Sequence, residues 1–173
     1  MKNNLDLSII ILELGVNAFD AFCKNLSIKI IDDVVKSFEI ADDGFGIEVS
    51  IIDKVCLPSF STKPNHLGNG LSKIKDFCEK NEGYLQVFSE TKQGTVVQGT
   101  VNCSLGDLTS SIICLVLNDI ESDVVIDYQK NNKNFYLNTK DLKNKLNINS
   151  LTEPSIVKEI MKMIDDGLNS IKE

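Results

Sequence analysis

Several features are scarce or missing in this 173-residue sequence, and each absence excludes a class of protein. No apolar run approaches the roughly 20 residues that a membrane-spanning helix needs, so we expect no membrane association. Basic side chains are too few for a nucleic-acid-binding surface. There are 18 Lys and Arg against 25 Asp and Glu, which gives a net charge of −7 and disfavours contact with phosphate backbones.

Closely spaced cysteines are also missing. The five cysteines are scattered and form no C-x-x-C motif; they are Cys23, Cys56, Cys78, Cys103 and Cys114. Metal sites and disulfide frameworks normally show tighter spacing. We therefore expect buried free thiols, which behave as small hydrophobes.

The N-terminus lacks a convincing signal peptide. Lys2 precedes an apolar stretch over residues 5–16, but Asp6 and Glu13 interrupt it, and no cleavage site of small residues follows. We interpret the stretch as a helix of the mature protein and expect a cytoplasmic location.

Composition and length favour a folded globular chain. Hydrophobic residues make up 42% and charged residues 25% of the sequence, which are ordinary values for a globular protein and exclude disorder. A chain of 173 residues suits one domain, or one domain with a substantial appendage.

Hydrophobic periodicity predicts an alternation of helices and strands. The predicted order over the first part is a helix at 8–24, strands at 26–31 and 34–41, a short helix at 47–56, a loop at 57–69, a helix at 71–80, and strands at 84–89 and 95–102. After residue 104 we expect a helix capped by Asp107, a hairpin over 124–138, a short helix capped by Thr139, and a last helix opened by Thr152 and Pro154. The predicted division is a domain at 1–104 and an appendage at 105–173, packed on the domain.

Three short motifs could form a binding site. Glu13 and Asn17 lie one helical turn apart, so a carboxylate and an amide point the same way; they could orient water and ligate Mg²⁺, or form the solvated edge of an amphipathic helix. Asp42-Asp43-Gly44-Phe45-Gly46 is either a hairpin turn or a turn that places Asp42 beside an adenine. Gly68-Asn69-Gly70 precedes a helix and could expose N–H groups to an anion.

Taken in order, these motifs resemble the N, G1, F, G2 and G3 boxes of the GHKL superfamily, the gyrase, heat-shock chaperone, histidine kinase and mismatch-repair ATPases. The matching segments are Glu13-x-x-x-Asn17-Ala18, Asp42-Asp43-Gly44-Phe45-Gly46-Ile47, Phe60-Ser61-Thr62-Lys63, Gly68-Asn69-Gly70-Leu71-Ser72 and Gly94-Thr95. The resemblance covers about residues 8–103 and is strongest to the ATP-binding half of sensor histidine kinases. It implies the Bergerat α/β two-layer sandwich, with helices on one face of a mixed sheet and a mobile lid over the nucleotide.

The resemblance also implies a role for each matching residue. Glu13 matches the general base, Asn17 the Mg²⁺ ligand and Asp42 the adenine-binding carboxylate. Gly44 and Gly46 would pass close to the base, and Thr95 would support Asp42. Phosphate binding falls to Lys63, Gly68 and Gly70, with Leu71 beside them.

Two positions depart from the family pattern, and one element is missing. Asp43 stands where Asn is usual, and His66 takes roughly the place of the first glycine of the G2 box. A helix pair with a phosphoacceptor histidine is not found, since His66 is the only histidine. We therefore do not expect a self-contained autophosphorylating sensor kinase. The tail from about residue 105 weakly resembles that of small stand-alone ATP-binding proteins of anaerobic bacteria that accompany iron hydrogenase-type redox subunits.

Three functions remain open at this point. The first is a Mg-ATP-binding regulator with slow hydrolysis that reports its nucleotide state to a protein partner. The second is a protein kinase that transfers the γ-phosphate to a Ser or His of a partner. The third is a non-catalytic nucleotide-sensing or structural subunit of a larger complex, with a redox complex as one case.

Overall fold

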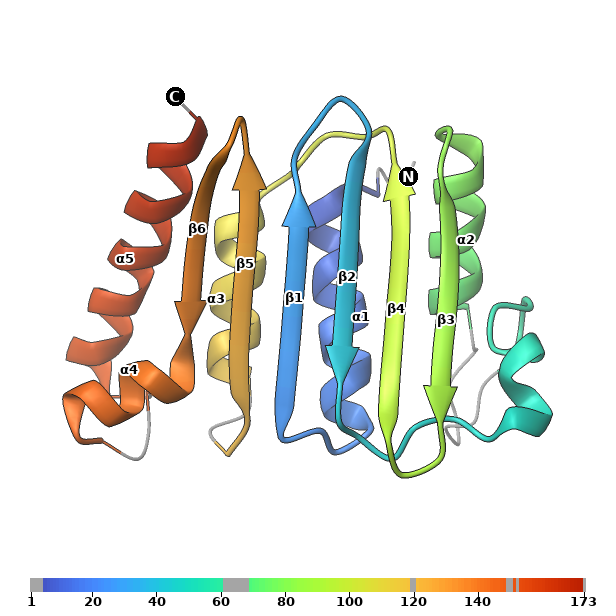
Figure 1. Cartoon of the computed structure of the whole chain (residues 1–173), viewed down its shortest axis with the longest axis horizontal. Coiled ribbons are helices and arrows are strands. Elements are labelled where there is room, and N and C mark those ends of the chain that lie inside the picture. Colours follow the sequence, from blue (N-terminus) through green and yellow to red (C-terminus); the bar gives the residue numbers. More distant parts are fainter. Residues whose placement is uncertain (1–4, 61–68, 119–120, 149–150, 152, 173) are drawn as a thin grey trace.

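The computed structural model describes residues 5–60, 69–118, 121–148, 151 and 153–172. Its centre is one six-stranded sheet with the order β3-β4-β2-β1-β5-β6 (Figure 1). The strands are β1 (Asn25–Ile31), β2 (Lys36–Asp42), β3 (Tyr84–Glu90), β4 (Gly94–Val101), β5 (Asp123–Lys130) and β6 (Lys133–Asn138). Strand β1 runs parallel to β5, and every other neighbouring pair is antiparallel. The sheet is therefore mixed.

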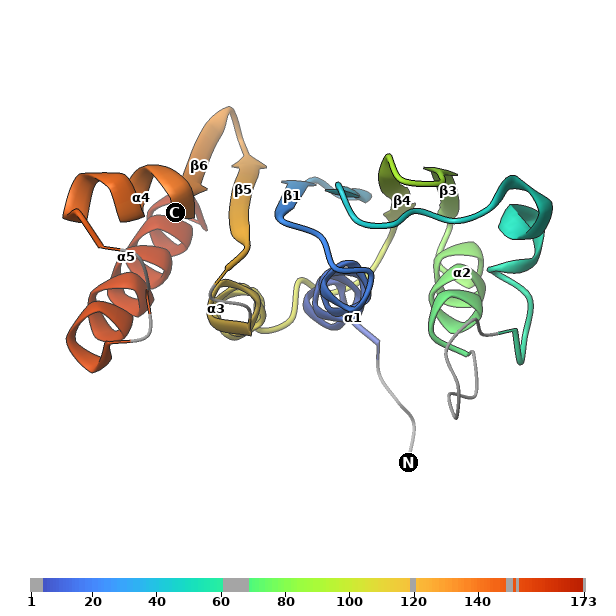
Figure 2. The ribbon, with the colours of Figure 1, turned by 90° about the horizontal axis from the view of Figure 1, so that it is seen from below.

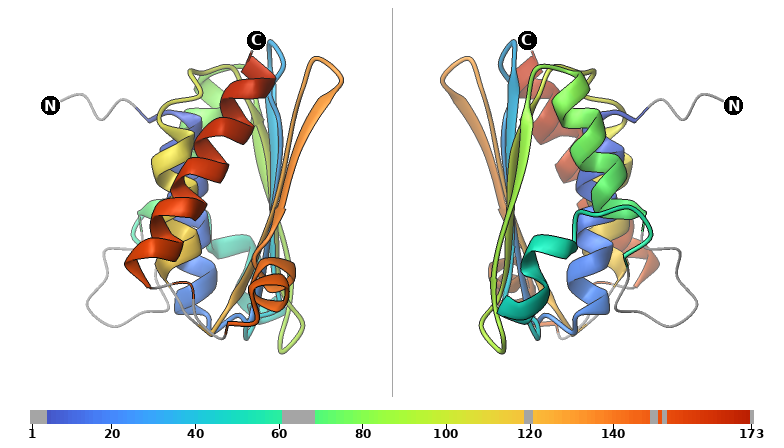
Figure 3. Two further views of the ribbon diagram at one scale, coloured as in Figure 1. Left: turned by 90° about the vertical axis from the view of Figure 1, so that its left-hand side faces the viewer. Right: turned by 90° about the vertical axis from the view of Figure 1, so that its right-hand side faces the viewer.

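Four helices cover one face of this sheet (Figure 2). They are α1 (Leu7–Asp20), α2 (Gly70–Lys80), α3 (Leu108–Asn118) and α5 (Pro154–Lys172). The short helix α4 (Thr139–Leu146) lies at the end of the sheet where β5 begins, and η1 (Val49–Lys54) lies beside β3 (Figure 3). Helices on one face of a mixed sheet confirm the predicted two-layer fold.

The core lies between the sheet and the helices, as alternation in the strands requires. Along β1, Leu26, Ile28 and Ile30 are buried and the intervening residues are exposed. Helix α1 begins after Asp6, whose carboxylate accepts from the N–H of Ile9 at 3.0 Å. Its apolar face is buried against the same core. None of the helices in the described part of the chain is long and apolar enough to cross a membrane.

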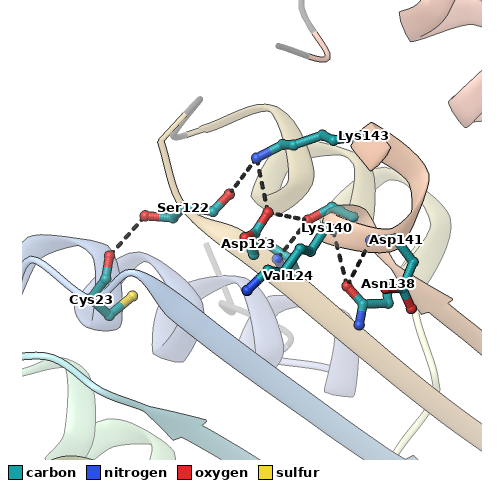
Figure 4. Close-up of polar contacts among 9 residues, drawn as sticks. Cys23, Ser122, Asp123, Val124, Asn138, Lys140, Asp141 and Lys143 are labelled. Carbon is teal, nitrogen blue, oxygen red and sulfur yellow. Dashed lines mark hydrogen bonds and ion pairs between the residues drawn. The ribbon is translucent and has the colours of Figure 1, made fainter. Parts of the chain in front are cut away.

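The two parts of the chain share this sheet. Strand β5 pairs with β1 over all seven residues of β1. At the start of β5 the Ser122 hydroxyl donates to the carbonyl of Cys23 at 2.7 Å, and Lys143 of α4 contacts the Asp123 carboxylate at 3.0 Å (Figure 4). Residues after 104 therefore extend the sheet built by the first part.

Four sequence expectations differ in detail from the structure. The first helix ends at Asp20 rather than near residue 24, and the short helix after the glycine turn is a 3-10 helix. The cap of α4 is Asn138, because the Thr139 hydroxyl instead accepts from the N–H of Val124. All five cysteines are free, but Cys23 and Cys78 alone are buried, and Cys114 is exposed.

Candidate functional site

A cavity of about 500 Å³ opens between α1, the ends of β2 and β4, and the first turn of α2. This volume lies within the range of small-molecule and cofactor sites. The predicted site residues that line it are Glu13, Asn17, Asp42, Gly46, Gly70, Leu71 and Thr95. Lys63 and Gly68 lie outside the described residues. Segments up to 82 residues apart in the sequence, from Glu13 to Thr95, thus meet at one cavity.

Helix α1 brings Glu13 and Asn17 to the cavity because its other side is buried. Leu7, Ile11 and Leu14 face the core, which leaves Glu13 exposed and Asn17 half-buried on the cavity side. A Cβ added to Gly70 would lie 3.9 Å from Glu13 Oε2. The carboxylate therefore stands directly opposite the start of α2.

Asp42 is the last residue of β2 and faces the same cavity. Its Oδ1 accepts from the N–H of Gly44 at 2.9 Å. Burial raises the pKa of this carboxyl above its ordinary value, and the negative charge of Asp43 adds to that effect. Backbone hydrogen bonds from Gly44 and Thr95 offset part of the rise in pKa. The result is a partly desolvated acceptor in a fixed orientation.

The glycines around Asp42 allow close packing of backbone. Gly46 and Gly94 have φ values of +66° and +95°, which side-chain-bearing residues rarely adopt. A Cβ on Gly44 would lie 2.6 Å from the carbonyl oxygen of Ala21, and one on Gly94 would overlap the carbonyl of Asp42. The space beside these glycines is therefore taken by the protein's own backbone.

The start of α2 forms the opposite wall of the cavity. Gly70 is its first residue, so the first N–H groups of the helix lie at the cavity. Asn69 precedes it and accepts from the N–H of Ser59 through Oδ1 at 3.0 Å. That hydrogen bond ties the start of α2 to the chain segment that follows η1.

Sequence reasoning missed two features of this site. The Ser89 hydroxyl lies 2.9 Å from Thr95 Oγ1, accepts from the N–H of Ile47 at 2.8 Å and donates to the Gly94 carbonyl, so it joins the Asp42–Ile47 motif to the Gly94-Thr95 motif. Phe45 lines the cavity and pairs with Phe22, with ring centroids 5.4 Å apart. The inward-facing position of Ser89 in an alternating strand was the one available signal, whereas nothing in the sequence pairs the two rings.

Charge in the described lining is negative. Glu13, Asp20 and Asp42 contribute carboxylates, and no group of three or more His, Cys, Asp or Glu suited to a metal occurs among the residues that the structure describes. An anionic ligand therefore needs a cation with it or the N–H groups of α2 to bind here.

The chain was compared with known protein families, curated proteins and solved structures. The model of the family described as histidine kinase-, DNA gyrase B-, and HSP90-like ATPase matches residues 2–104. A crystal structure of the N-terminal domain of a DNA repair protein is similar, with a TM-score of 0.56 and 14% identity. The likeness covers 77% of this chain and 51% of that one, so the chain spans about half of that structure, and it concerns the fold alone. No curated protein matches the chain.

Proposed function

Because the chain belongs to the family of histidine kinase-, DNA gyrase B- and HSP90-like ATPases, which bind ATP, we propose that it binds Mg-ATP as a regulator and hydrolyses it slowly. The observation that supports this proposal is the meeting of Glu13, Asn17, Asp42, Gly70 and Thr95 at one cavity. We propose further that the chain acts in the cytoplasm on a protein partner. A protein is favoured over nucleic acid as the partner because a net charge of −7 disfavours contact with phosphate backbones.

Asp42 is the proposed adenine receptor. Its carboxylate accepts a hydrogen bond from the exocyclic amino group of adenine. Guanine carries an oxygen at the same position and would place a second acceptor against the carboxylate. A buried polar group left unpaired disfavours binding, so this contact selects adenine nucleotides.

Asn17 and Glu13 are the proposed polar groups near the phosphates. Mg²⁺ accepts a few hard oxygens from a protein and takes the rest from phosphates and water, so a single amide oxygen on α1 fits it without a carboxylate cage. When bound, Mg²⁺ neutralises phosphate charge. Glu13, one turn before Asn17, is placed to orient a water molecule and accept its proton.

The start of α2 is the proposed phosphate site. Gly70 and Leu71 line the cavity in the first turn of α2, where the N–H groups have no partner within the helix and the helix dipole favours an anion. Lys63 and Gly68 complete this proposed site from the segment outside the described residues. Gly44 and Thr95 hold the Asp42 carboxylate through backbone hydrogen bonds. In this proposal the backbone of Gly44 and Gly46 passes close to the base, and Gly46 lines the cavity.

The first experiment measures thermal unfolding of the whole chain with Mg-ATP, Mg-ADP and Mg-GTP, beside Asp42→Asn. At a ligand concentration 100 times the Kd, binding adds about 2.7 kcal/mol to the free energy of unfolding. We expect a rise in Tm with the adenine nucleotides alone and none in the variant. If none of the nucleotides raises the Tm of the chain, the proposal is contradicted and the non-catalytic structural role is left.

A protein kinase is the second candidate, because Glu13 at the cavity could equally activate a hydroxyl or imidazole of a partner. ATP labelled at the γ-phosphate separates the two functions. Label released as inorganic phosphate by the chain alone supports hydrolysis. Label that appears on a partner protein, and only when the partner is present, supports transfer.

A further inference from the structure

The turn that holds Asp42 contains a second carboxylate with a different set of contacts. Asp43 does not line the cavity; its side chain turns back to the segment that joins α1 to β1. Oδ1 accepts from the N–H of Lys24 at 2.7 Å and from the N–H of Asn25 at 2.8 Å, and Oδ2 accepts from Asn25 Nδ2 at 2.6 Å. These three hydrogen bonds form a clip, hereafter the Asp43–Asn25 clip.

The clip continues the pairing of two strands. The antiparallel register of β1 and β2 ends with Leu26 opposite Asp42, so Asn25 and Asp43 are the next pair. At this pair the Asp43 side chain supplies the acceptors. The ladder is thereby extended by one step into the turn, directly beside Asp42.

The segment that receives the clip is itself fixed from the other side. Ser122 Oγ donates to the carbonyl of Cys23 at 2.7 Å (Figure 4), and the N–H of Asp123 donates to the carbonyl of Lys24 at 2.8 Å. Strand β5 thus holds residues 23–25 in place. The turn at Asp43 is therefore bound to a segment that is itself held by β5.

The other end of the turn is anchored near the same segment. The N–H of Phe45 donates to the carbonyl of Ala21 at 2.9 Å, and Gly44 packs against that carbonyl. Residues 43 and 45 are therefore both bound to the chain between α1 and β1. Asn17 lies on the last turns of α1, so the clip also fixes Asp42 relative to Asn17.

We propose that Asp43 is a positioning residue that orients Asp42 for adenine through the Asp43–Asn25 clip, and so sets the preference of the site for adenine over guanine nucleotides. The proposal rests on the proposed function, in which Asp42 receives adenine. Recognition depends on carboxylate placement to within about 0.5 Å, and the backbone of residues 42–44 decides that placement. Asp fits this position because three donors converge on its two carboxylate oxygens.

A compensating exchange tests the clip. Asp43→Ala removes all three bonds, and Asn25→Asp places two carboxylates against each other. In the double variant Asp43→Asn with Asn25→Asp, the new amide accepts from the backbone N–H groups and donates to the new carboxylate. We expect each single variant to weaken Mg-ATP binding about tenfold, because the turn that carries Asp42 loses its fixed orientation, and to lower the ratio of ATP to GTP affinity. The double variant restores both to within about threefold.

Asp127→Ala is the matched control. Asp127 accepts from Asn134 Nδ2 at 2.8 Å on the open face of the sheet, so the variant also removes a carboxylate–amide pair between strands. We expect it to leave nucleotide affinity unchanged. If Asp43→Ala lowers Tm but keeps the wild-type affinity and nucleotide preference, as the control does, Asp43 only stabilises the fold and the proposal is overturned.

Amide hydrogen exchange without nucleotide separates this proposal from the proposed function. Asp43→Ala should accelerate exchange at Gly44 and Phe45, and the double variant should slow it again. Unchanged exchange in Asp43→Ala overturns the clip as a positioning device, even if the wild type binds ATP. A wild type that binds no adenine nucleotide overturns the proposed function and the nucleotide preference with it, while the exchange data still report whether the clip orders the turn.

Discussion

At the scale of single residues, the proposed role of Glu13 as general base can be tested by one conservative substitution. Glu13→Gln keeps the size and the hydrogen-bonding oxygen but removes the proton acceptor. We expect Mg-ATP binding to stay within about threefold of wild type while phosphate release falls about 10²–10⁴-fold, the usual effect of losing a general base. Steady-state phosphate release and titration of binding measure the two quantities.

The control for Glu13 is Glu79→Gln on α2, an exposed carboxylate paired with Lys75 at 3.9 Å outside the cavity. It should leave both quantities unchanged. Full phosphate release by Glu13→Gln would place the base elsewhere. A loss of binding in that variant would make Glu13 a binding residue.

Stability and nucleotide binding place opposite demands on the Asp42 carboxyl, because burial favours its protonated form whereas the proposed contact with adenine needs the carboxylate. Burial raises its pKa in the folded chain, so the folded state favours the protonated form. This contribution is fully present below the ordinary pKa of 3.8 and is lost as pH rises through the raised pKa. Without nucleotide, Asp42→Asn should therefore gain Tm relative to wild type as pH rises through that window. Thermal melts from pH 3.5 upward measure the difference, and a constant or falling difference would contradict the prediction.

The sequence identified the residues of the site better than their partners. Glu13, Asn17 and Asp42 were found because helical spacing and the Asp-Gly turn are local patterns that also resemble a known family. The contacts of Asp43 with Asn25 and of Ser89 with Thr95 could not be predicted, because each depends on the register between neighbouring strands. The close backbone contacts of Gly44 and Gly46 could not be predicted either, because only the folded turn brings Ala21 and Glu90 beside them. The approach of these glycines to a base stays a prediction.

At the scale of elements, the packing of α1 on α3 depends on Gly15. A Cβ at Gly15 would lie 2.5 Å from Leu115 Cδ2, and Leu115 is fully buried. Alanine improves helix propensity by up to about 1 kcal/mol, but overpacking costs about 1–3 kcal/mol. We expect Gly15→Ala to lower the free energy of unfolding by about 1 kcal/mol, measured by chemical denaturation.

The control for this contact is the same substitution in a Leu115→Ala background, where the space is free. Leu115→Ala alone should cost about 2–5 kcal/mol. Adding Gly15→Ala should then recover stability rather than lose more. A Gly15→Ala penalty of equal size in both backgrounds would show that Leu115 is not its cause.

A second element contact joins β5 to the β1–β2 hairpin through Asp32. Its carboxylate lies 3.1 Å from Lys130 Nζ and 3.4 Å from Lys36 Nζ, and accepts from the Tyr128 hydroxyl at 2.8 Å. Burial raises the pKa of Asp32, but these hydrogen bonds and positive charges outweigh burial and lower it below the ordinary 3.8. The stabilisation is present above that value and is lost as pH falls through the lowered pKa.

Acid titration of stability tests the Asp32 contact. Wild type should lose stability steeply below about pH 4, whereas Asp32→Asn, already less stable at pH 7, should show a shallower slope there. Tyr128→Phe removes the neutral partner and should cost about 1 kcal/mol. Parallel acid slopes in wild type and Asp32→Asn would contradict the contribution of Asp32.

Element order and type could largely be predicted, because periodicity is a local property. The pairing of β1 with β5 could not, since it joins residues about a hundred positions apart and no pattern in either strand selects the other. The cap of α4 was missed for a similar reason: Thr139 is a good cap by type, but its hydroxyl bonds to Val124 of β5. Tertiary contacts override local preference at such positions.

At the scale of the whole molecule, the family match and the physical unit do not end at the same place. The match stops at residue 104, but β1 lies in the middle of the sheet only because β5 covers its edge. Helix α3 packs on α1, and its Leu108, Ile112 and Leu115 belong to the same core as Ile10 and Ile11. We therefore expect residues 105–173 to support the fold of the nucleotide site.

Truncation after residue 104 tests this dependence. The fragment would expose the β1 edge and one face of α1, and a loss of only about 3 kcal/mol lowers the Tm of a domain of that size by about 12–24 °C. We expect circular dichroism to show a weak or absent transition for the fragment. Mg-ATP should raise its Tm, because every proposed site residue precedes residue 104, and separately added 105–173 should restore the transition. A fragment as stable as the full chain would instead make 1–104 an independent domain, and the role of the remaining residues would then lie outside folding.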